Sequence, residues 1–303
     1  MSDYVKRLRL NRALWGLSLA FFVALVFVLS GKAQGSRPQP VTSVRLYVFD
    51  LGARPAPEGR GGEAVPTVSP AYLIVHPKGT MMWEAGALPD TYVGSKQSRL
   101  NIRDNIRFWQ NEVTLKSRLA EIGYKASDIT YLGLSHFHDD HTANANDFAA
   151  STWLVQRDEH AVMFGDMASP NELSFRIADF RTYWALKKAK AVLIPQKDYD
   201  VFGDGTVEIV YTPANTPGGQ ALFVKLAKTG PIVLSGDLYH GYSEHEPPFT
   251  KGMIGTNTEA DNKMTVASRI RLEEYMKEHS AKLWIQHDYP FYMTLKKSPE
   301  YYE

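Results

Sequence analysis

Three histidines and one aspartate, close together in the chain, are the residues best suited to chemistry. His136, His138 and His141 fall within six residues, and Asp140 stands beside the last of them. Imidazole and carboxylate groups are ligands that suit zinc and similar divalent ions. In an extended or tightly looped segment side chains alternate, so the first two histidines share one side and the Asp-His pair can face a second ion. The spacing therefore favours two neighbouring metals over one, and over a solvated loop with surface histidines.

Short apolar strands must position these side chains. Residues 129–134 form an apolar run with β-branched and aromatic members, which predicts a buried strand that ends where the histidines begin. Residues 231–234 predict a second strand that leads to Asp237, and residues 282–285 predict a third that leads to His287.

With this motif the chain resembles the metallo-β-lactamase superfamily, whose defining pattern is His-x-His-x-Asp-His. The resemblance implies an α/β fold, the αββα four-layer sandwich of two mixed sheets flanked by helices, with the metals at the sandwich edge. It also implies two Zn²⁺ sites, although other divalent ions are possible. By the family pattern the first metal takes His136 and His138, the second takes Asp140, His141 and His287, and Asp237 bridges the two.

The loop at residues 212–220 departs from the family pattern. It contains the expected Thr-Pro-Gly, but it has Asn215 where superfamily hydrolases carry a His that completes the first site, and Gly219 where the lactonase pattern has a second His. An amide oxygen is a neutral and weaker zinc ligand than imidazole. Asn215 is thus either a weak metal ligand or only a turn residue. If it is a ligand, the first site is labile, prefers another ion or is completed by a water molecule.

Within the superfamily, three stretches look like the N-acyl-homoserine-lactonase-like family: residues 46–50, 235–240 and 284–288. This resemblance implies a metal-dependent hydrolase that opens a lactone or related ester by attack of a metal-bound hydroxide. Such an enzyme would be quorum quenching.

Four residues are candidates for the catalytic steps. The resemblance implies that Asp140 or Asp237 helps to move the proton. It also implies that Tyr239 or His240 touches the substrate carbonyl, and packing at the base of the loop is the alternative for both.

Two other functions compete with a lactonase. A cysteine-free metallo-β-lactamase is one, against which Asp237 argues because a bridging carboxylate marks the lactonase and thioesterase branches. A metal-impaired homologue that binds a ligand or partner without turnover is the other, and Asn215 motivates it. The aromatic-rich, mostly helical stretch 157–190 either packs in the core or walls an apolar pocket, so the expected partner is a small molecule with an apolar chain.

Composition excludes several classes of protein. The net charge of +1 gives no electrostatic case for nucleic acid binding. Cysteine is absent, so disulfides and thiolate metal ligands are excluded, together with metallo-β-lactamases that place a Cys at the second metal.

The N-terminus predicts export. Basic residues precede an apolar run at 13–29, and small residues follow it, which describes residues 1–33 as a signal peptide or an N-terminal membrane anchor. Cleavage after Ala33 would release a periplasmic or secreted protein, whereas an uncleaved run would anchor it to the inner membrane. Residues 34–43 read as a linker and 44–303 as the hydrolase domain.

Other elements are predicted from periodicity and turn residues. We expect a hairpin of strands 71–76 and 80–83, a loop at 53–65, a helix from 96 to 124 that stops at Gly123, and a helix at 262–279.

Overall fold

A computed structural model of the chain describes residues 40–55, 65–94, 109–165, 180–250 and 259–303. The described residues belong to one compact unit. The predicted signal or anchor and residues 34–39 of the predicted linker lie outside the described residues. No helix among the described residues has the length and apolar character that a membrane crossing requires.

The first sheet is mixed, with the strand order β1-β4-β5-β6-β7-β8. Its first strands pair antiparallel, and β5 to β8 run parallel. Its strands β4 and β5 are the predicted hairpin, in register from Tyr72 opposite Trp83 to His76 opposite Gly79. The strands are β1 (Arg45–Phe49), β4 (Ala71–His76), β5 (Gly79–Trp83), β6 (Tyr131–Gly133), β7 (Thr152–Gln156) and β8 (Ala191–Ile194).

The second sheet has the order β13-β12-β11-β10-β9, with β12 and β13 parallel and the remaining pairs antiparallel. A separate short ribbon joins β2 (Ala53–Arg54) to β3 (Thr67–Val68), inside or beside the predicted loop. The strands of the second sheet are β9 (Tyr199–Asp200), β10 (Val207–Tyr211), β11 (Gln220–Leu226), β12 (Gly230–Leu234) and β13 (Lys282–Trp284).

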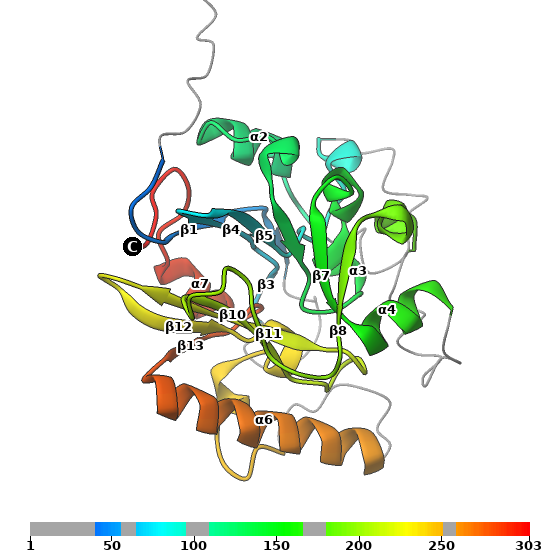
Figure 1. The fold of residues 1–303 in the computed structure, drawn as a ribbon, viewed down its shortest axis with the longest axis vertical. Helices are drawn as coiled ribbons and strands as arrows, with labels where there is room; N and C mark the ends of the chain where they lie inside the picture. The colour runs from blue at the N-terminus through cyan, green and yellow to red at the C-terminus, as the bar shows by residue number, and fades with distance from the viewer. Residues whose placement is uncertain (1–39, 56–64, 95–108, 166–179, 251–258) are drawn as a thin grey trace, which may run out of the picture. The chain divides into compact units, whose positions relative to one another are not determined.

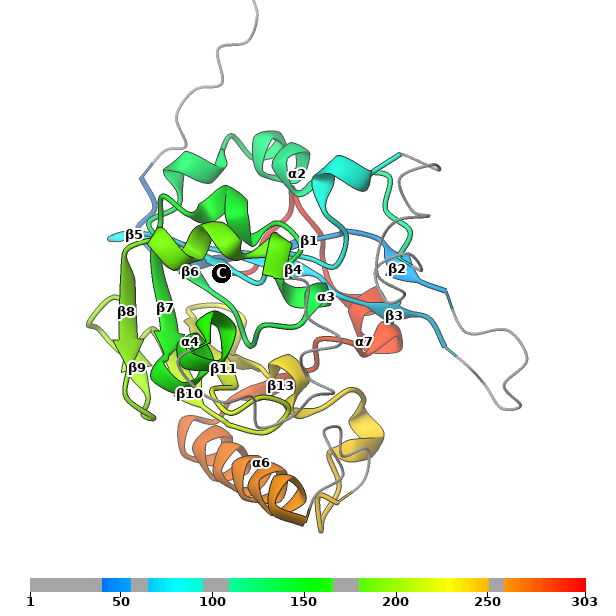
Figure 2. The ribbon, with the colours of Figure 1, turned by 90° about the vertical axis from the view of Figure 1, so that its right-hand side faces the viewer.

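Helices cover the outer face of each sheet, so that four layers result (Figure 1). Helix α6 runs along the second sheet on the side away from the first (Figure 2). The helices are α2 (Leu115–Glu121), α3 (Asp139–Thr142), α4 (Arg157–Phe164), α6 (Glu259–His279) and α7 (Tyr289–Thr294). Single 3₁₀ turns are η1 (Asp90–Tyr92), η4 (Ala126–Asp128), η5 (Ala145–Phe148), η6 (Phe180–Thr182), η7 (Trp184–Lys188), η8 (Gly236–Leu238) and η9 (Tyr242–Glu244).

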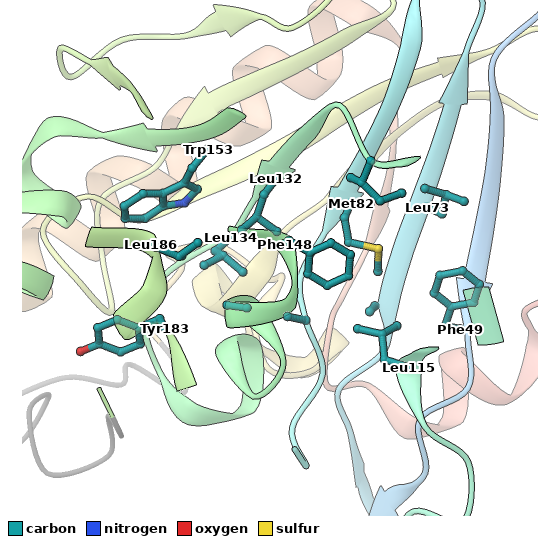
Figure 3. Packing of buried hydrophobic residues seen from close by; sticks show 14 of the residues in the cluster. Phe49, Leu73, Met82, Leu115, Leu132, Leu134, Phe148, Trp153, Tyr183 and Leu186 are labelled. Carbon is teal, nitrogen blue, oxygen red and sulfur yellow. The ribbon is translucent and has the colours of Figure 1, made fainter. Parts of the chain in front are cut away.

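Alternation along the strands divides the core into layers. In β4, Leu73 and Val75 join the cluster under α2 and α4, whereas Tyr72 and Ile74 join the cluster between the two sheets. This is the period of two that a strand buried on both faces requires. Figure 3 shows the outer cluster, in which strand residues such as Leu132 meet Phe148 and Leu186. A third cluster joins the second sheet to α6.

Two helix predictions need correction. Among the described residues of the predicted 96–124 helix, only Leu115–Glu121 is α-helical, and Gln110 instead forms a bridge to Ala53. The Thr114 hydroxyl accepts a hydrogen bond from the backbone N–H of Ser117, so it starts a new helix there. In the predicted helical stretch 157–190, α4 ends at Gly165 in the left-handed conformation, and the described residues after 179 form 3₁₀ turns. The remainder of both stretches lies outside the described residues.

Candidate metal centre

The candidate ligands meet at one edge of the sandwich. Strands β6, β10, β12 and β13 all end there at their carboxyl termini, because strands that run in the same direction bring their ends to the same edge of a sheet. The residues that follow these strands include all the predicted metal ligands: His136, His138, Asp140 and His141 after β6, Asn215 after β10, Asp237 after β12 and His287 after β13. They form two groups that share Asp237.

The second group consists of Asp140, His141 and His287, which offer ligand atoms within 4.8 Å of one another. The Nε2 atoms of His141 and His287 lie 3.1 and 3.0 Å from Asp237 Oδ1. Asp140 completes the ring, with Oδ1 3.7 Å from His141 Nε2 and Oδ2 3.5 Å from His287 Nε2. Four side chains thus converge on one small space.

Neighbouring oxygens orient the imidazoles of this group. His287 Nδ1 is hydrogen-bonded to the Val68 carbonyl. His141 Nδ1 lies 3.3 Å from the Ser135 hydroxyl and 3.4 Å from the Glu84 carboxylate. A partner on Nδ1 turns Nε2 toward the centre, which is the arrangement that metal-binding histidines use.

Glu84 is a functional residue that sequence reasoning missed. It is completely buried beyond the end of β5, at φ +64, and it accepts a hydrogen bond from the Ser135 N–H as well as facing His141. The signal available in the sequence was a carboxylate directly after an apolar strand and before Ala85-Gly86.

The first group consists of His136, His138 and Asp237. His136 Nε2 lies 2.8 Å from His138 Nδ1 and 3.5 Å from Asp237 Oδ2. Asn215 reaches into this group: its Nδ2 atom lies 3.2 Å from each of the two imidazole nitrogens, and it donates a hydrogen bond of 3.1 Å to Asp237 Oδ2. Asn215 is therefore part of the centre and not only a turn residue.

The two groups differ in electrostatics. Burial and the neighbouring imidazoles lower the pKa of His136 well below its usual value, and burial lowers that of His138 to about 4. Burial also disfavours the charged form of His141, but the negative charges of Asp237 and two further carboxylates outweigh it and raise its pKa. For Asp237 burial is likewise outweighed, by His141 and the other imidazoles, and its pKa falls well below the usual range. The second group is thus the more anionic environment.

The ligand sets of the two groups differ in how well they fit the metal that the resemblance implies. In the second group, Asp237 Oδ1 lies 3.1 Å from His141 Nε2 and 3.0 Å from His287 Nε2, and both Asp140 oxygens face these nitrogens. The ligand atoms of four side chains therefore point into one space. Two imidazole nitrogens and two carboxylates fit a zinc-type ion. In the first group, the facing atoms of both histidines already have Asn215 as a partner.

His240 and Tyr239, the two predicted carbonyl contacts, point to different places. His240 Nε2 lies 3.5 Å from Asp237 Oδ2, and its ring stacks on that of His287. Its pKa is raised to about 9, because Asp237 and Glu244 outweigh the effect of burial. The Tyr239 hydroxyl instead donates to Glu273, away from the ligands. The structure brings only His240 to the centre.

Glu159 joins the two loops that carry the first group. Its buried carboxylate accepts hydrogen bonds from the Phe137 N–H at 2.8 Å, the Thr216 hydroxyl at 2.7 Å and the Gly218 N–H at 3.0 Å. A Cβ atom on Gly218 would lie 2.4 Å from the Glu159 nitrogen, so only glycine permits this approach. This three-bond clamp holds the loop after β6 against the loop after β10.

Comparisons with known proteins agree with this architecture. N-acyl homoserine lactonase AttM of Rhizobium radiobacter is 26% identical to the chain over 275 residues, a match that covers 86% of this chain and 100% of that protein. N-acyl homoserine lactonase AiiA of Bacillus thuringiensis subsp. kurstaki is 26% identical over 185 residues, covering 60% of this chain and 65% of that protein.

A solved structure has the same fold. It is an N-acyl homoserine lactone hydrolase with the product N-hexanoyl-L-homoserine bound at its catalytic metal centre, and it has a TM-score of 0.68 and 21% sequence identity over 86% of this chain and 100% of that one. The predicted four-layer fold is confirmed. Residues 64–275 match the family model of the metallo-beta-lactamase superfamily, which is more than half of the chain. The chain therefore belongs to the metallo-β-lactamase superfamily.

Proposed function

We propose that this protein is a metal-dependent hydrolase that opens a lactone or related ester, of the N-acyl homoserine lactone type. The observation that carries the proposal is the convergence of the ligand atoms of His141, His287, Asp140 and Asp237 on one small space. Relatives named N-acyl homoserine lactonases match 86% and 60% of the chain, which favours this substrate class over β-lactams. Such an activity would be quorum quenching.

Zinc is the metal that we propose, because imidazole nitrogens and carboxylate oxygens are its common protein ligands. Asp140, His141, His287 and Asp237 would hold it. A bound zinc ion supplies a Lewis acid and lowers the pKa of water so that hydroxide exists near neutral pH.

The chain's own carboxylates would handle the proton and the charge. Asp140 is 30% exposed and reaches both the ligand cluster and solvent, which suits it to accept a proton and release it. Asp237 is 7% exposed and faces four imidazoles, which suits it to neutralise positive charge across the centre.

His240 is the residue that we propose for contact with the substrate carbonyl. Its side chain is 24% exposed, in contrast to the fully buried ring of His141, so a substrate can reach it. Glu244 holds it in place: the carboxylate accepts the backbone N–H of His240 and lies 3.6 Å from its Nδ1. Buried Arg269 in turn donates to Glu244 at 2.8 Å. An N–H fixed in this way can stabilise the oxygen on which negative charge develops.

The function is tested on the full-length protein, purified and supplied with zinc. We expect it to hydrolyse N-hexanoyl and N-decanoyl homoserine lactone, measured as acid release in a pH-stat, and to leave the β-lactam nitrocefin intact. Hydrolysis of nitrocefin without lactone hydrolysis would instead support the β-lactamase alternative. An unaltered, zinc-loaded protein inert toward lactones, esters and β-lactams would replace this proposal with the non-catalytic one.

We also propose that the protein acts outside the cytoplasm, on the basis of the basic residues and apolar run at its N-terminus. Sequencing the N-terminus of the protein from its own cells should give Gln34 if the signal is cleaved, or an uncleaved chain in the inner membrane. An intact Met1 in the soluble cytoplasmic fraction would contradict export.

A further inference from the structure

We propose that this protein holds one catalytic ion, in the Asp140-His141-His287-Asp237 group, and that the Asn215 side-chain amide takes the place of the second ion. The inference deepens the proposed function and rests on it for the identity of the centre. It departs from the two-metal arrangement that the histidine motif by itself predicts.

The amide nitrogen of Asn215 lies among the ligand atoms of the first group. Asn215 Nδ2 lies 3.2 Å from His136 Nε2, 3.2 Å from His138 Nδ1 and 3.1 Å from Asp237 Oδ2. These are hydrogen-bond distances, about 1 Å longer than zinc–ligand bonds. The nitrogen therefore lies among the same three side chains that would surround an ion.

The orientation of the amide follows from its partners. Exchanging the nitrogen and oxygen of an asparagine amide changes its shape little, so its partners must decide which atom faces the centre. An ionised carboxylate such as Asp237 only accepts hydrogen bonds, and its Oδ2 atom lies 3.1 Å from the amide. The nitrogen must then face Asp237, which removes the amide oxygen from the position of a ligand.

The two groups differ in the number of carboxylates and in the hydrogen-bond partners around their ligand atoms. In the second group, three carboxylates, those of Glu84, Asp140 and Asp237, surround the imidazole of His141. A bound cation would neutralise this concentration of negative charge. In the first group, Asp237 is the only carboxylate among the ligands, and the histidine atoms that face Asn215 have hydrogen-bond partners.

A substitution at position 215 should restore the second metal site. A cavity of about 10 Å³ adjoins His136, Asn215, Gly219 and Asp237. An imidazole at position 215 would offer the third nitrogen ligand that the first site lacks. Asn215→His should therefore build a two-ion centre.

The test is a count of zinc in the full-length protein. After incubation with zinc and removal of loosely held ion by gel filtration, we expect one equivalent in the unaltered protein and two in Asn215→His. Asn215→Ala, which removes the amide without adding a ligand, is the matched control and should stay at one. X-ray absorption should show a zinc–zinc distance of about 3.5–4 Å in Asn215→His only.

Single-ligand variants locate the ion. His138→Ala should keep its equivalent of zinc, and His287→Ala should lose it, with circular dichroism reporting that each variant is folded. Two equivalents and a zinc–zinc distance in the unaltered protein would overturn the inference, and so would loss of zinc from His138→Ala with retention in His287→Ala. Because the zinc count does not depend on turnover, a protein with one ion but no lactone hydrolysis would refute the proposed function and leave this inference standing.

Discussion

The two halves of the centre contain similar side chains but differ in the charges and hydrogen-bond partners around them. Around His141 and His287, three buried or half-buried carboxylates face two imidazoles. Around His136 and His138, the facing nitrogens have each other and the Asn215 amide as hydrogen-bond partners. A metal-binding motif thus indicates which ligands are present, whereas the neighbouring charges and hydrogen-bond donors decide whether an ion binds.

The largest effect should come from Asp237, the residue that both halves share. In Asp237→Asn, we expect kcat/KM for a homoserine lactone to fall by about 10³-fold or more, because a neutral amide removes several kcal/mol of charge stabilisation at the centre. Initial rates with metal-supplemented protein measure it. Activity close to that of the unaltered protein would mean that Asp237 is not part of the reacting centre.

The next prediction separates the two halves directly. His141→Ala should lower kcat/KM by about 10²-fold or more, whereas His138→Ala should cost less than about tenfold, since the Asn215 half is not expected to hold the catalytic ion. Both variants are assayed with the same zinc supply. Equal and large losses would show that both halves take part in turnover, and the comparison would then fail.

A smaller effect is expected at His240, which borders both halves. His240→Phe should lower kcat by about 10²-fold at nearly constant KM, because it removes a donor that acts on developing charge. Tyr239→Phe is the matched control: its hydroxyl bonds Glu273, so it should leave kcat unchanged and cost about 1 kcal/mol of stability. If Tyr239→Phe lost activity and His240→Phe did not, the assignment would be reversed.

The smallest effect concerns stability and the Glu159 clamp. Burial raises the pKa of Glu159 to about 7, against 4.5 for an ordinary glutamate, so between these values the folded state keeps a proton that the unfolded state has released. The free energy of unfolding should then fall as the pH rises from 4.5 to 7, by at most about 3 kcal/mol for this group.

Glu159→Gln, which cannot ionise, should flatten this fall. Thermal melts of both proteins at intervals between pH 5 and 8 measure the difference. Parallel pH profiles for the two proteins would show that Glu159 stays ionised in the folded state.

The ligands were predictable because each directly follows an apolar strand. The local motif at His136–His141 could be recognised without any tertiary information. Asp237 and His287 come shortly after the ends of β12 and β13. The choice between Tyr239 and His240 could not be predicted, since the 3₁₀ turn Gly236–Leu238 sets which side chain faces the centre. Gly236, at φ +52, passes so close to Ser135 that a Cβ atom would lie 2.5 Å from the serine Cβ.

Long-range contacts explain the other omissions. Trp109 belongs to the apolar pattern that predicted a helix, but its neighbour Gln110 pairs with Ala53, and pairing between distant segments outweighs local propensity. Strand β11 was not predicted, although it is the centre of the second sheet, because its apolar run follows the Thr-Pro-Gly loop without a boundary of its own. Glu159 lies in a helical stretch, and only the fold shows that it reaches Phe137 and Thr216.

The Glu159 clamp has a consequence for how such centres evolve. It grips the loop after β10 at Thr216 and Gly218, next to Asn215 but not through it. The side chain at position 215 can therefore be exchanged while the loop backbone stays in place. Codons for asparagine and histidine differ by a single base. A single base change could then alter the number of ions in this centre during evolution without disturbing the backbone that carries the ligands.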